Sequence, residues 1–423
     1  MKDLIKIFPN NEPFENNSSD SNDYGNKGSN LLKMSEWDIP IPPGFILPNN
    51  ICNEILKTGR INSKTKKEIL LSLRKLEKLT HKDYGGESPL LISIRSSPPV
   101  SMPGMMDTII NVGIDKNTIK NLIVFSKDKK FPLDCYQRFL SSYLNIVYKT
   151  PYIIDENKKS IKEIELTIKT LLSKLPKIHN IEDHLFSGII SIVKSWNNPR
   201  AIKYRNNKNI PHGDGTSVII QSMIFGNLSN SYTGVLFTRS PVDGNKSIFG
   251  EYTLNQQGPN LVEGITTPLN LNKLENKKIL SELKKISLNL EDKFKDMMDI
   301  EFTIENNKIY ILQSRVGKRT SIAANKIAED MFKEGLINEQ TYLSRKPKNI
   351  KKPSTISIPS NSILIGIGTP ACPGIAEGYL TTNPHSEISG KKILCRPYTT
   401  PEDVCNLEDF EALITAEGGV TSH

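Results

Sequence analysis

Apolar residues recur at helical spacing most clearly between residues 64 and 79. From Ile69 onward they fall every three or four positions on one face, and Thr65 with Glu68 has the spacing of a capping box. The segment 115–200 follows a similar pattern, with apolar stripes interrupted by polar turns. The chain is therefore expected to form a capped helix at 64–79 and several more helices up to residue 200.

One further helix and the start of regular structure can be read from the sequence. TSIAANKIAEDMFKEGLI predicts a helix that is capped by Thr320 or Ser321 and stops near Gly335. Residues 10–26 are rich in Asn, Ser and Asp, which is typical of a loop. Regular structure at the start of the chain is expected from Gly28.

Other segments have the short apolar or alternating sequences that are typical of β-strands. LLISIRSS (90–97) is an apolar run that predicts a buried strand, IPIPPGFIL (39–47) predicts an extended segment, and short strands follow residue 216. DIEFTIENNKIYILQSR (299–315) predicts two strands joined at an Asn-Asn turn. Helices and strands together indicate an α+β fold.

The length of 423 residues predicts two or three domains, because one compact core rarely grows so large. A stretch rich in Lys, Pro and Ser suggests a linker, and short strands follow it. We expect a first domain at 1–340, a linker at 341–362 and a small, unfinished domain at 363–423.

Composition changes this picture little. Charged residues make up 24% and hydrophobic ones 37%, as in ordinary globular proteins, and the net charge is +9. Lysines are scattered, and the one dense basic run, 346–352, lies in the linker. No nucleic-acid module is recognisable, so the basic surface is expected to suit small anionic substrates.

The five cysteines are far apart and form no metal or disulfide motif. No signal peptide and no run of ~18 apolar residues that could cross a membrane is evident. A reduced, cytoplasmic chain without structural metal and without a membrane partner is expected. Five histidines lie in polar stretches and are expected at the surface: His81, His179, His184, His212 and His385.

Paired carboxylates mark the predicted hairpin. Asp299 and Glu301 are two apart, so on a strand they project from one face, where they could hold Mg²⁺ bound to nucleotide phosphates. A solvated strand face is the simpler alternative. Gln313 and Arg315 alternate in the same way on the returning strand, which would gather an amide and a guanidinium beside the carboxylates.

Two cations are candidates for phosphate binding. Arg95 lies near the end of a predicted strand, where its planar fork could read phosphate oxygens or form a structural salt bridge. Lys27 lies among small residues in GNKGSN, which would allow close approach to a phosphate, although a single lysine in a polar loop is more often solvated. His423 ends the chain, either as a phosphoryl carrier or as a plain terminal residue.

Together these stretches resemble the pyruvate, phosphate dikinase family across nearly the whole chain. MPGMMDT with GKRT is the most specific pair of strings, and it separates the resemblance from pyruvate, water dikinases. The others run in the family's order: NKGSNLLKM, IPIPPGF, SIRSS, SWNNPRAIKYR, IIQSMIFGN, TGVLFTRSPVDGNKSIFGEY, DIEFTIENNKIYILQSRVGKRT, TPACPGIAEG and EGGVTSH.

The resemblance implies an ATP-grasp nucleotide-binding domain followed by an incomplete swivelling phosphohistidine (β/β/α) domain. In the family an α/β barrel comes next and converts pyruvate to phosphoenolpyruvate. The implied chemistry moves the β-phosphoryl of ATP to a histidine and the γ-phosphoryl to inorganic phosphate, with Mg²⁺ as cofactor. Pyruvate would be reached only through the missing barrel or a partner chain.

Site residues follow from the motifs by resemblance. The implied ligands of the ATP phosphates, of the nucleotide and of Mg²⁺ are Lys27, Arg95, Gln221, Glu251, Asp299, Glu301, Gln313 and Arg315. Asp299 and Glu301 would bind the metal, the loop from Ser101 to Asp107 would cover the phosphates, and His423 would carry the phosphoryl group.

The chain departs from the family pattern in two places. After the Arg-Ser of SIRS the family usually has glycine and then alanine, whereas this chain has Ser97-Pro98-Pro99. Proline restricts the backbone of a loop that is expected to move. The chain also ends at His423, before the rest of the carrier domain. Three accounts follow: half of an enzyme completed by another polypeptide, a MgATP-binding module without catalysis, or an inactive truncated product.

Overall fold

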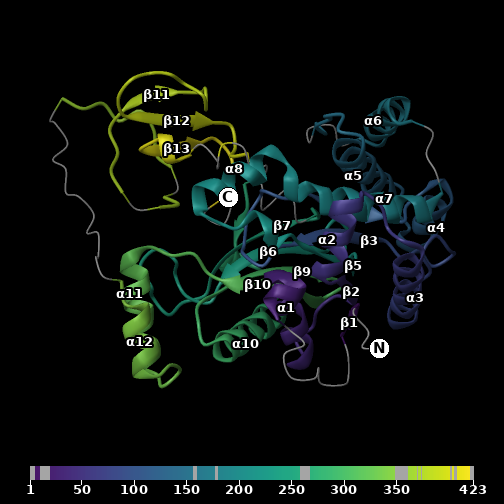
Figure 1. The fold of residues 1–423 in the computed structure, drawn as a ribbon. Helices are drawn as coiled ribbons and strands as arrows, with labels where there is room; N and C mark the ends of the chain where they lie inside the picture. The colour runs from purple at the N-terminus through teal and green to yellow at the C-terminus, as the bar shows by residue number, and fades with distance from the viewer. Residues whose placement is uncertain are drawn as a thin grey trace. The chain divides into compact units, whose positions relative to one another are not determined.

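The structure is a computed structural model in which the chain folds as two compact units, residues 1–224 and residues 225–423 (Figure 1). It describes residues 5–9, 20–155, 160–176, 180–257, 267–347, 361–368, 370–372, 374–400, 403 and 407–419. Both units contain helices and strands, with runs of consecutive helices and of consecutive strands, so the predicted α+β class is confirmed.

The first unit is built on a five-stranded sheet in the order β1-β2-β5-β3-β4. Every neighbouring pair in it is antiparallel. Its strands are β1 (Lys6–Phe8), β2 (Gly44–Leu47), β3 (Ile92–Ser97), β4 (Thr108–Val112) and β5 (Ser217–Ser222). The strands expected at 39–47 and 90–97 are therefore present as β2 and β3, and β3 delivers Arg95 near its end.

Eight helices accompany this sheet in the described part of the first unit. They are α1 (Ser21–Glu36), α2 (Asn49–Thr58), α3 (Ser63–Thr80), α4 (Lys116–Ser126), α5 (Lys130–Val147), α6 (Ile161–Lys174), α7 (Ile181–Lys194) and α8 (Pro199–Lys208). Helices α1 and α7 both contact β3 and β5. The helical reading of 115–200 is confirmed.

Helix α1 corrects the expectation that order begins at Gly28. It begins at Ser21, where the side chain of Asp20 accepts a hydrogen bond from the Asn22 backbone N–H at 2.9 Å. The Asn- and Asp-rich stretch contains this cap, and such residues favour helix starts as well as loops. Residues 10–19 of the expected loop lie outside the described residues.

His184 corrects another expectation. It is only 3% exposed, because it lies on the inward face of α7. Its ring centroid is 5.1 Å from that of Phe139 and 5.2 Å from that of Tyr143, both on α5. Polar neighbours in sequence do not place a residue at the surface when helical spacing turns it inward.

The cap of α3 differs from the predicted one. The residue before the helix, Asn62, accepts a hydrogen bond from the Thr65 backbone N–H at 2.8 Å. Thr65 is therefore the third helical residue, not the cap, and the proposed box with Glu68 is wrong. The predicted helix itself is confirmed, with bounds of Ser63–Thr80.

Replacing Asn62 by Ala is expected to cost about 1 kcal/mol of stability, because it removes this side-chain acceptor from the helix N-terminus. Glu68→Ala serves as the comparison, since Glu68 plays no part in the observed cap. Urea denaturation of both variants measures the difference. A larger loss for Glu68→Ala than for Asn62→Ala would contradict the assigned cap.

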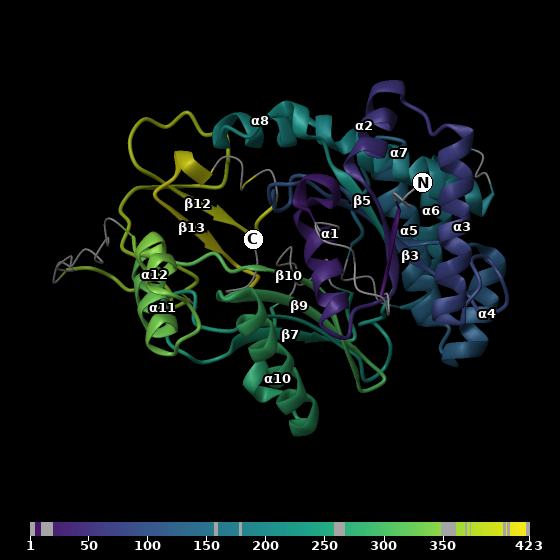
Figure 2. The ribbon, with the colours of Figure 1, turned by 60° about the horizontal axis from the view of Figure 1, so that its bottom comes forward.

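The second unit contains a five-stranded antiparallel sheet in the order β10-β9-β6-β7-β8. Its strands are β6 (Tyr232–Phe237), β7 (Phe249–Leu254), β8 (Leu269–Asn270), β9 (Met298–Glu305) and β10 (Lys308–Val316). Helix α10 (Lys277–Phe294) contacts β9 and β10 (Figure 2). The predicted hairpin is confirmed as β9 and β10 with Asn306 and Asn307 at its turn, both at positive φ.

Two short helices, α11 (Ser321–Lys333) and α12 (Glu339–Arg345), follow the hairpin and pack on each other. The Thr320 side chain caps α11 by accepting from the Ala323 N–H at 3.0 Å. Gly335 has φ +73° just beyond the helix. Both predicted boundaries of this helix are confirmed.

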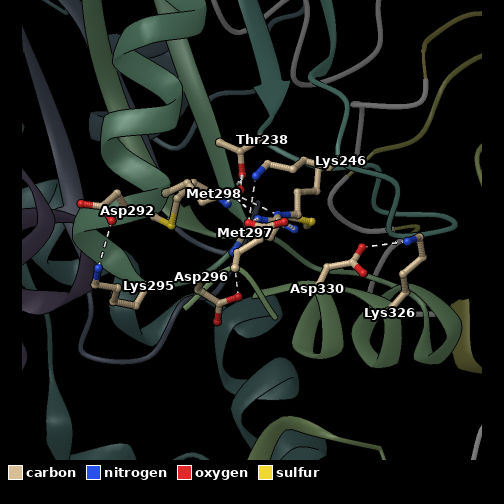
Figure 3. Close-up of polar contacts among 12 residues, drawn as sticks. Thr238, Lys246, Asp292, Lys295, Asp296, Met297, Met298, Lys326 and Asp330 are labelled. Atoms are coloured by element: carbon tan, nitrogen blue, oxygen red, sulfur yellow. Dashed lines mark hydrogen bonds and ion pairs between the residues drawn. The ribbon is translucent and has the colours of Figure 1, made fainter. Parts of the chain in front are cut away.

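Two hydrogen bonds join the first residue of β9 to the residue that follows β6 (Figure 3). The Met298 N–H donates to the Thr238 hydroxyl at 3.0 Å, and the Thr238 N–H donates to the Met298 carbonyl at 3.0 Å. Next to it, the fully buried Arg239 pairs with Glu291 at 2.8 Å and with Glu334 at 2.7 Å. Burial opposes the charge on Arg239, but the two carboxylates outweigh it and raise the pKa of the guanidinium. This network fixes the backbone from which Asp299 projects.

After the segment expected to be a linker, three short strands form a parallel sheet in the order β11-β12-β13. They are β11 (Tyr379–Thr381), β12 (Lys392–Arg396) and β13 (Ala412–Thr415). The apolar run 363–368, which was expected to be a strand, has no regular structure, and Ile363 is 85% exposed. An apolar run forms a strand only where a partner strand accepts its hydrogen bonds. In the described part of the chain no helix is long and apolar enough to span a membrane.

Candidate functional site

The first group of predicted residues lies at β3 and β5. Arg95 on β3 donates from Nη1 to the Gln221 Oε1 on β5, at 3.4 Å. Gln221 is 2% exposed, and its Nε2 donates to the Pro42 carbonyl at 3.0 Å, which fixes the direction of the amide. A buried amide held in this way orients the guanidinium, so the structure brings Arg95 and Gln221 together.

Lys27 lies just after a kink in α1. Gly25 has φ +67° and ψ +171°, values outside the helical region, and the helix continues beyond it. The Asn26 N–H donates to the Pro98 carbonyl at 2.9 Å. The turn that carries Lys27 is therefore attached to the residues that follow β3, and Pro98, which departs from the family pattern, supplies one of the contacts.

The second group lies on the hairpin of β9 and β10. In the observed register Arg315 is directly opposite Asp299, and Gln313 is directly opposite Glu301. Directly opposed residues of an antiparallel pair project to the same face, as do residues two apart. All four predicted side chains therefore share one face, as the alternating pattern indicated.

Glu251 lies in the same row of this sheet. Val235 on β6 is opposite both Glu301 on β9 and Glu251 on β7. The two carboxylate-bearing residues are thus two strands apart on one face, about 10 Å at the usual strand spacing. Glu251 extends the polar row beyond the hairpin, on the far side of a buried valine.

Asp299 is the most constrained member of the group. It is 6% exposed, and its Oδ2 accepts a hydrogen bond from Arg315 Nε at 2.7 Å. Its other oxygen, Oδ1, is buried and accepts no hydrogen bond from any residue that the structure describes. A buried carboxylate oxygen without a donor is costly unless a cation binds it.

Burial raises the pKa of Asp299 above the ordinary value of 3.8, although Arg315 acts in the opposite direction. The pKa of Arg315 is raised as well, since Asp299 and Glu301 outweigh the effect of its burial. The positive charge of Arg315 therefore compensates the burial of the Asp299 carboxylate only in part. This environment favours binding of a further positive charge.

Across the described residues, no three His, Cys, Asp or Glu side chains gather closely enough to enclose a metal by themselves. Two carboxylates on adjacent positions of one strand face fit Mg²⁺ better than Zn²⁺, because Mg²⁺ commonly takes one or two carboxylates and completes its shell with water and phosphate oxygens. The hairpin thus offers oxygen ligands without a closed protein cage.

His423 lies outside the described residues, so its predicted role is not tested by the geometry. The segment before it is described up to Gly419. Glu417 accepts a hydrogen bond from the Thr267 hydroxyl at 2.6 Å. A Cβ added at Gly419 would come within 2.3 Å of the Glu251 carboxylate, so this backbone lies against Glu251.

The loop from Ser101 to Asp107 is held by residues that the sequence reading did not single out. Arg200 forms an ion pair with Asp107 and donates from Nε to the Met105 carbonyl at 3.1 Å. Asn198 donates to the other Asp107 oxygen at 2.8 Å. The string SWNNPR contains both partners, and its Asn-Pro pair at a helix start was the available signal.

Known proteins resemble this chain closely. The family described as "Pyruvate phosphate dikinase, AMP/ATP-binding domain" matches residues 61–278 and 269–336. The family described as "PEP-utilising enzyme, mobile domain" matches residues 388–423. Between them they cover the regions that carry the hairpin and the terminal segment.

Three curated relatives illustrate the similarity. The pyruvate, phosphate dikinase of Rickettsia prowazekii (strain Madrid E) is 39% identical over 461 residues, covering 100% of this chain and 52% of the relative. That of Clostridium symbiosum is 36% identical and covers 97% of this chain and 51% of the relative. That of Giardia intestinalis is 36% identical, with 94% and 49% covered.

The chain spans about half the length of the curated relatives it matches. The resemblance predicted from the motifs is confirmed by the family match, which extends over more than half of the chain and includes Arg95, Gln221 and the whole β9–β10 hairpin. This chain belongs to the pyruvate, phosphate dikinase family.

Proposed function

We propose that this chain is the MgATP-binding, phosphoryl-transferring part of a dikinase. Residues 1–340 would form an ATP-grasp nucleotide-binding domain, and 363–423 the beginning of a swivelling phosphohistidine domain, with 341–362 as the linker. The family match supports the nucleotide-binding assignment, since its description names an AMP/ATP-binding domain. The parallel strands β11 to β13 support a separate small sheet after the linker.

One observation carries the proposal: the buried Asp299 Oδ1 has no donor among the described residues, on a strand face that it shares with Glu301. An orphaned carboxylate oxygen beside a second carboxylate is expected where a cation binds and is unfavourable elsewhere. A purely solvated strand face, the simpler alternative, does not bury the oxygen.

Asp299 and Glu301 would hold Mg²⁺, and the Gln313 amide, opposite Glu301, would bind the triphosphate beside them. When bound, Mg²⁺ neutralises phosphate charge and orients the oxygens for displacement. Arg315 would keep Asp299 in place through its Nε contact. Glu251, in the same row, is a further candidate for contact with the nucleotide.

Lys27 and Arg95 would neutralise the phosphate oxygens. The Oε1 of Gln221 would hold the guanidinium of Arg95 in place, so that the Arg95 side chain would lose less rotational freedom when phosphate binds. The loop from Ser101 to Asp107 would cover the phosphates, with its exit attached to Arg200. These groups bind and orient, which is most of what phosphoryl transfer requires from a protein.

His423 would accept the β-phosphoryl group of ATP on a ring nitrogen, while the γ-phosphoryl goes to inorganic phosphate. The products of this half-reaction are phosphohistidine, AMP and diphosphate. Transfer from the histidine to pyruvate, which gives phosphoenolpyruvate, would need the barrel or a partner chain that carries it. A cytoplasmic location and the absence of nucleic-acid and membrane partners stay predictions.

The purified chain is expected to bind MgATP in calorimetry and, given ATP labelled in the β-phosphate together with inorganic phosphate, to acquire acid-labile label at His423. The matched comparison is His423→Ala, which should bind MgATP equally and acquire no label. Binding that is unchanged in Glu301→Gln would contradict the metal assignment, and no binding by the unaltered chain would overturn the proposal.

A MgATP-binding module without catalysis is the second candidate function. The departure at Ser97-Pro98-Pro99 favours it, because proline restricts the backbone of a loop that would have to close. This alternative predicts calorimetric binding without label. An inactive product predicts neither result.

A further inference from the structure

A hydroxyl group from β3 occupies the gap in the hydrogen-bond ladder of α1. In a regular helix the Gly28 N–H would donate to the Tyr24 carbonyl, four residues earlier. Here the Gly28 N–H donates to the Oγ of Ser97 at 3.0 Å, and the same Oγ donates to the Tyr24 carbonyl at 3.0 Å. Ser97 therefore bridges the two groups that the kink separates, and a side chain inserted in this way is a recognised cause of helix kinks.

The bridging hydroxyl is held on a rigid base. Ser97 is fully buried, and its N–H donates to the Thr216 hydroxyl at 3.1 Å. The Ser217 hydroxyl reaches both the Ser97 carbonyl, at 2.8 Å, and the Tyr24 carbonyl, at 2.5 Å. Since Ser97 pairs with Ser217 in the register of β3 and β5, the sheet determines where the Oγ lies.

The residues that the bridge encloses are Gly25, Asn26 and Lys27. Tyr24 and Gly28, on either side of them, both form hydrogen bonds with the Ser97 hydroxyl. The Asn26 N–H donates a hydrogen bond to the carbonyl of Pro98, the residue after Ser97. The backbone that carries Lys27 is thus attached to the end of β3 at three points. A lysine side chain has much rotational freedom, so a fixed backbone helps to limit where its ammonium can reach.

Arg95 is two residues before Ser97 on the same strand. The two side chains leave β3 on one face, and Arg95 is itself held by Gln221. One strand therefore sets the position of both cations, Arg95 directly and Lys27 through the bridge. A serine that only filled space in the core would not need both of its hydrogen bonds on either side of this one lysine.

We propose that Ser97 is a positioning residue for Lys27, and that it tunes the affinity of this chain for the phosphate groups of ATP. The inference rests on the proposed function, since it takes Lys27 to contact phosphate. The family resemblance implies glycine at this position, which has no hydroxyl, so the bridge is a feature of this chain. Ser97 does not touch the nucleotide and acts only through the turn of Lys27.

Ser97→Ala is expected to weaken MgATP binding about tenfold, the effect of losing one well-placed hydrogen-bonding group and loosening the lysine turn. Adenosine, which has no phosphate, should bind equally to the variant and to the unaltered chain. Ser72→Ala on α3 is the matched control, because Ser72 is also buried and donates to a backbone carbonyl. It should leave MgATP affinity unchanged.

The double variant with Lys27→Met separates positioning from a general loss of structure. If Ser97 acts through Lys27, adding Ser97→Ala to Lys27→Met weakens MgATP binding no further. Equal weakening in both backgrounds, or weaker adenosine binding, would overturn the proposal, as would unchanged affinity in the single variant. Failure of the unaltered chain to bind MgATP would instead count against the proposed function.

Discussion

Asp299→Asn is expected to weaken Mg²⁺-dependent ATP binding by at least about 100-fold while keeping the chain folded, because one of the two metal carboxylates loses its charge. The asparagine oxygen can still accept the hydrogen bond from Arg315 Nε, so the hairpin keeps its shape. Titration with ATP at fixed Mg²⁺, and again with EDTA, measures the metal-dependent part. Only that part should disappear.

The same substitution has a predictable effect on stability. Burial raises the pKa of Asp299 above 3.8, so the folded state holds this proton more tightly than the unfolded state does. The ionised carboxylate therefore destabilises the fold, and this cost grows as pH rises from 3.8 through the folded-state pKa. In metal-free buffer, the free energy of unfolding of Asp299→Asn should therefore increase relative to that of the unaltered chain as pH rises from 3.8 through the folded-state pKa of Asp299.

Chemical denaturation at several pH values between about 4 and 7 measures this difference. Asp292→Asn is the matched control, since Asp292 is an exposed residue paired only weakly with Lys295, at 2.9 Å, on α10. It should show neither the pH-dependent gain nor the loss of binding. A variant at Asp299 that is less stable at all pH values would mean that its ion pair with Arg315 outweighs the cost of burial.

Local pattern was sufficient to predict the hairpin but not its register. Alternation placed Asp299 with Glu301 and Gln313 with Arg315, and the Asn-Asn turn joined the strands. The register has an irregularity between Ile311 and Gln313, which changes the pairing along the hairpin. A bulge moves one side chain relative to its partner strand, so which carboxylate meets the guanidinium could not be read from spacing.

Contacts between distant residues account for what sequence reasoning missed. Ser97, which holds the Lys27 turn, is 69 residues from Gly28 and 73 residues from Tyr24 in the sequence. Arg200 is 93 residues from Asp107. Neither pairing leaves a periodic signal, because both depend on how the sheet brings separate segments together. The cap of α3 was missed for a simpler reason. Asn62 and Thr65 are both residue types that can cap a helix, and only Asn62 lies directly before the first helical residue.

Gly25→Ala is expected to reduce the free energy of unfolding by about 3 kcal/mol, combining a disfavoured backbone conformation with a steric overlap. A Cβ at this position would lie 1.7 Å from the Ser97 carbonyl oxygen and 2.4 Å from its Oγ. The backbone is unable to yield without breaking the bridge that holds the lysine turn. MgATP affinity should therefore fall at least about tenfold as well.

Gly335→Ala is the comparison for a glycine at positive φ without a close contact. Gly335 has nearly the same positive φ, +73° against +67°, but a Cβ there would meet nothing within 4 Å. That variant should lose only about 1 kcal/mol and keep its affinity for MgATP. Urea denaturation and calorimetry on both variants give the comparison. Equal losses and unchanged MgATP affinity in both variants would show that close contact with Ser97 does not matter at Gly25. Weaker MgATP binding by Gly25→Ala alone would show that the lysine turn depends on glycine at this position.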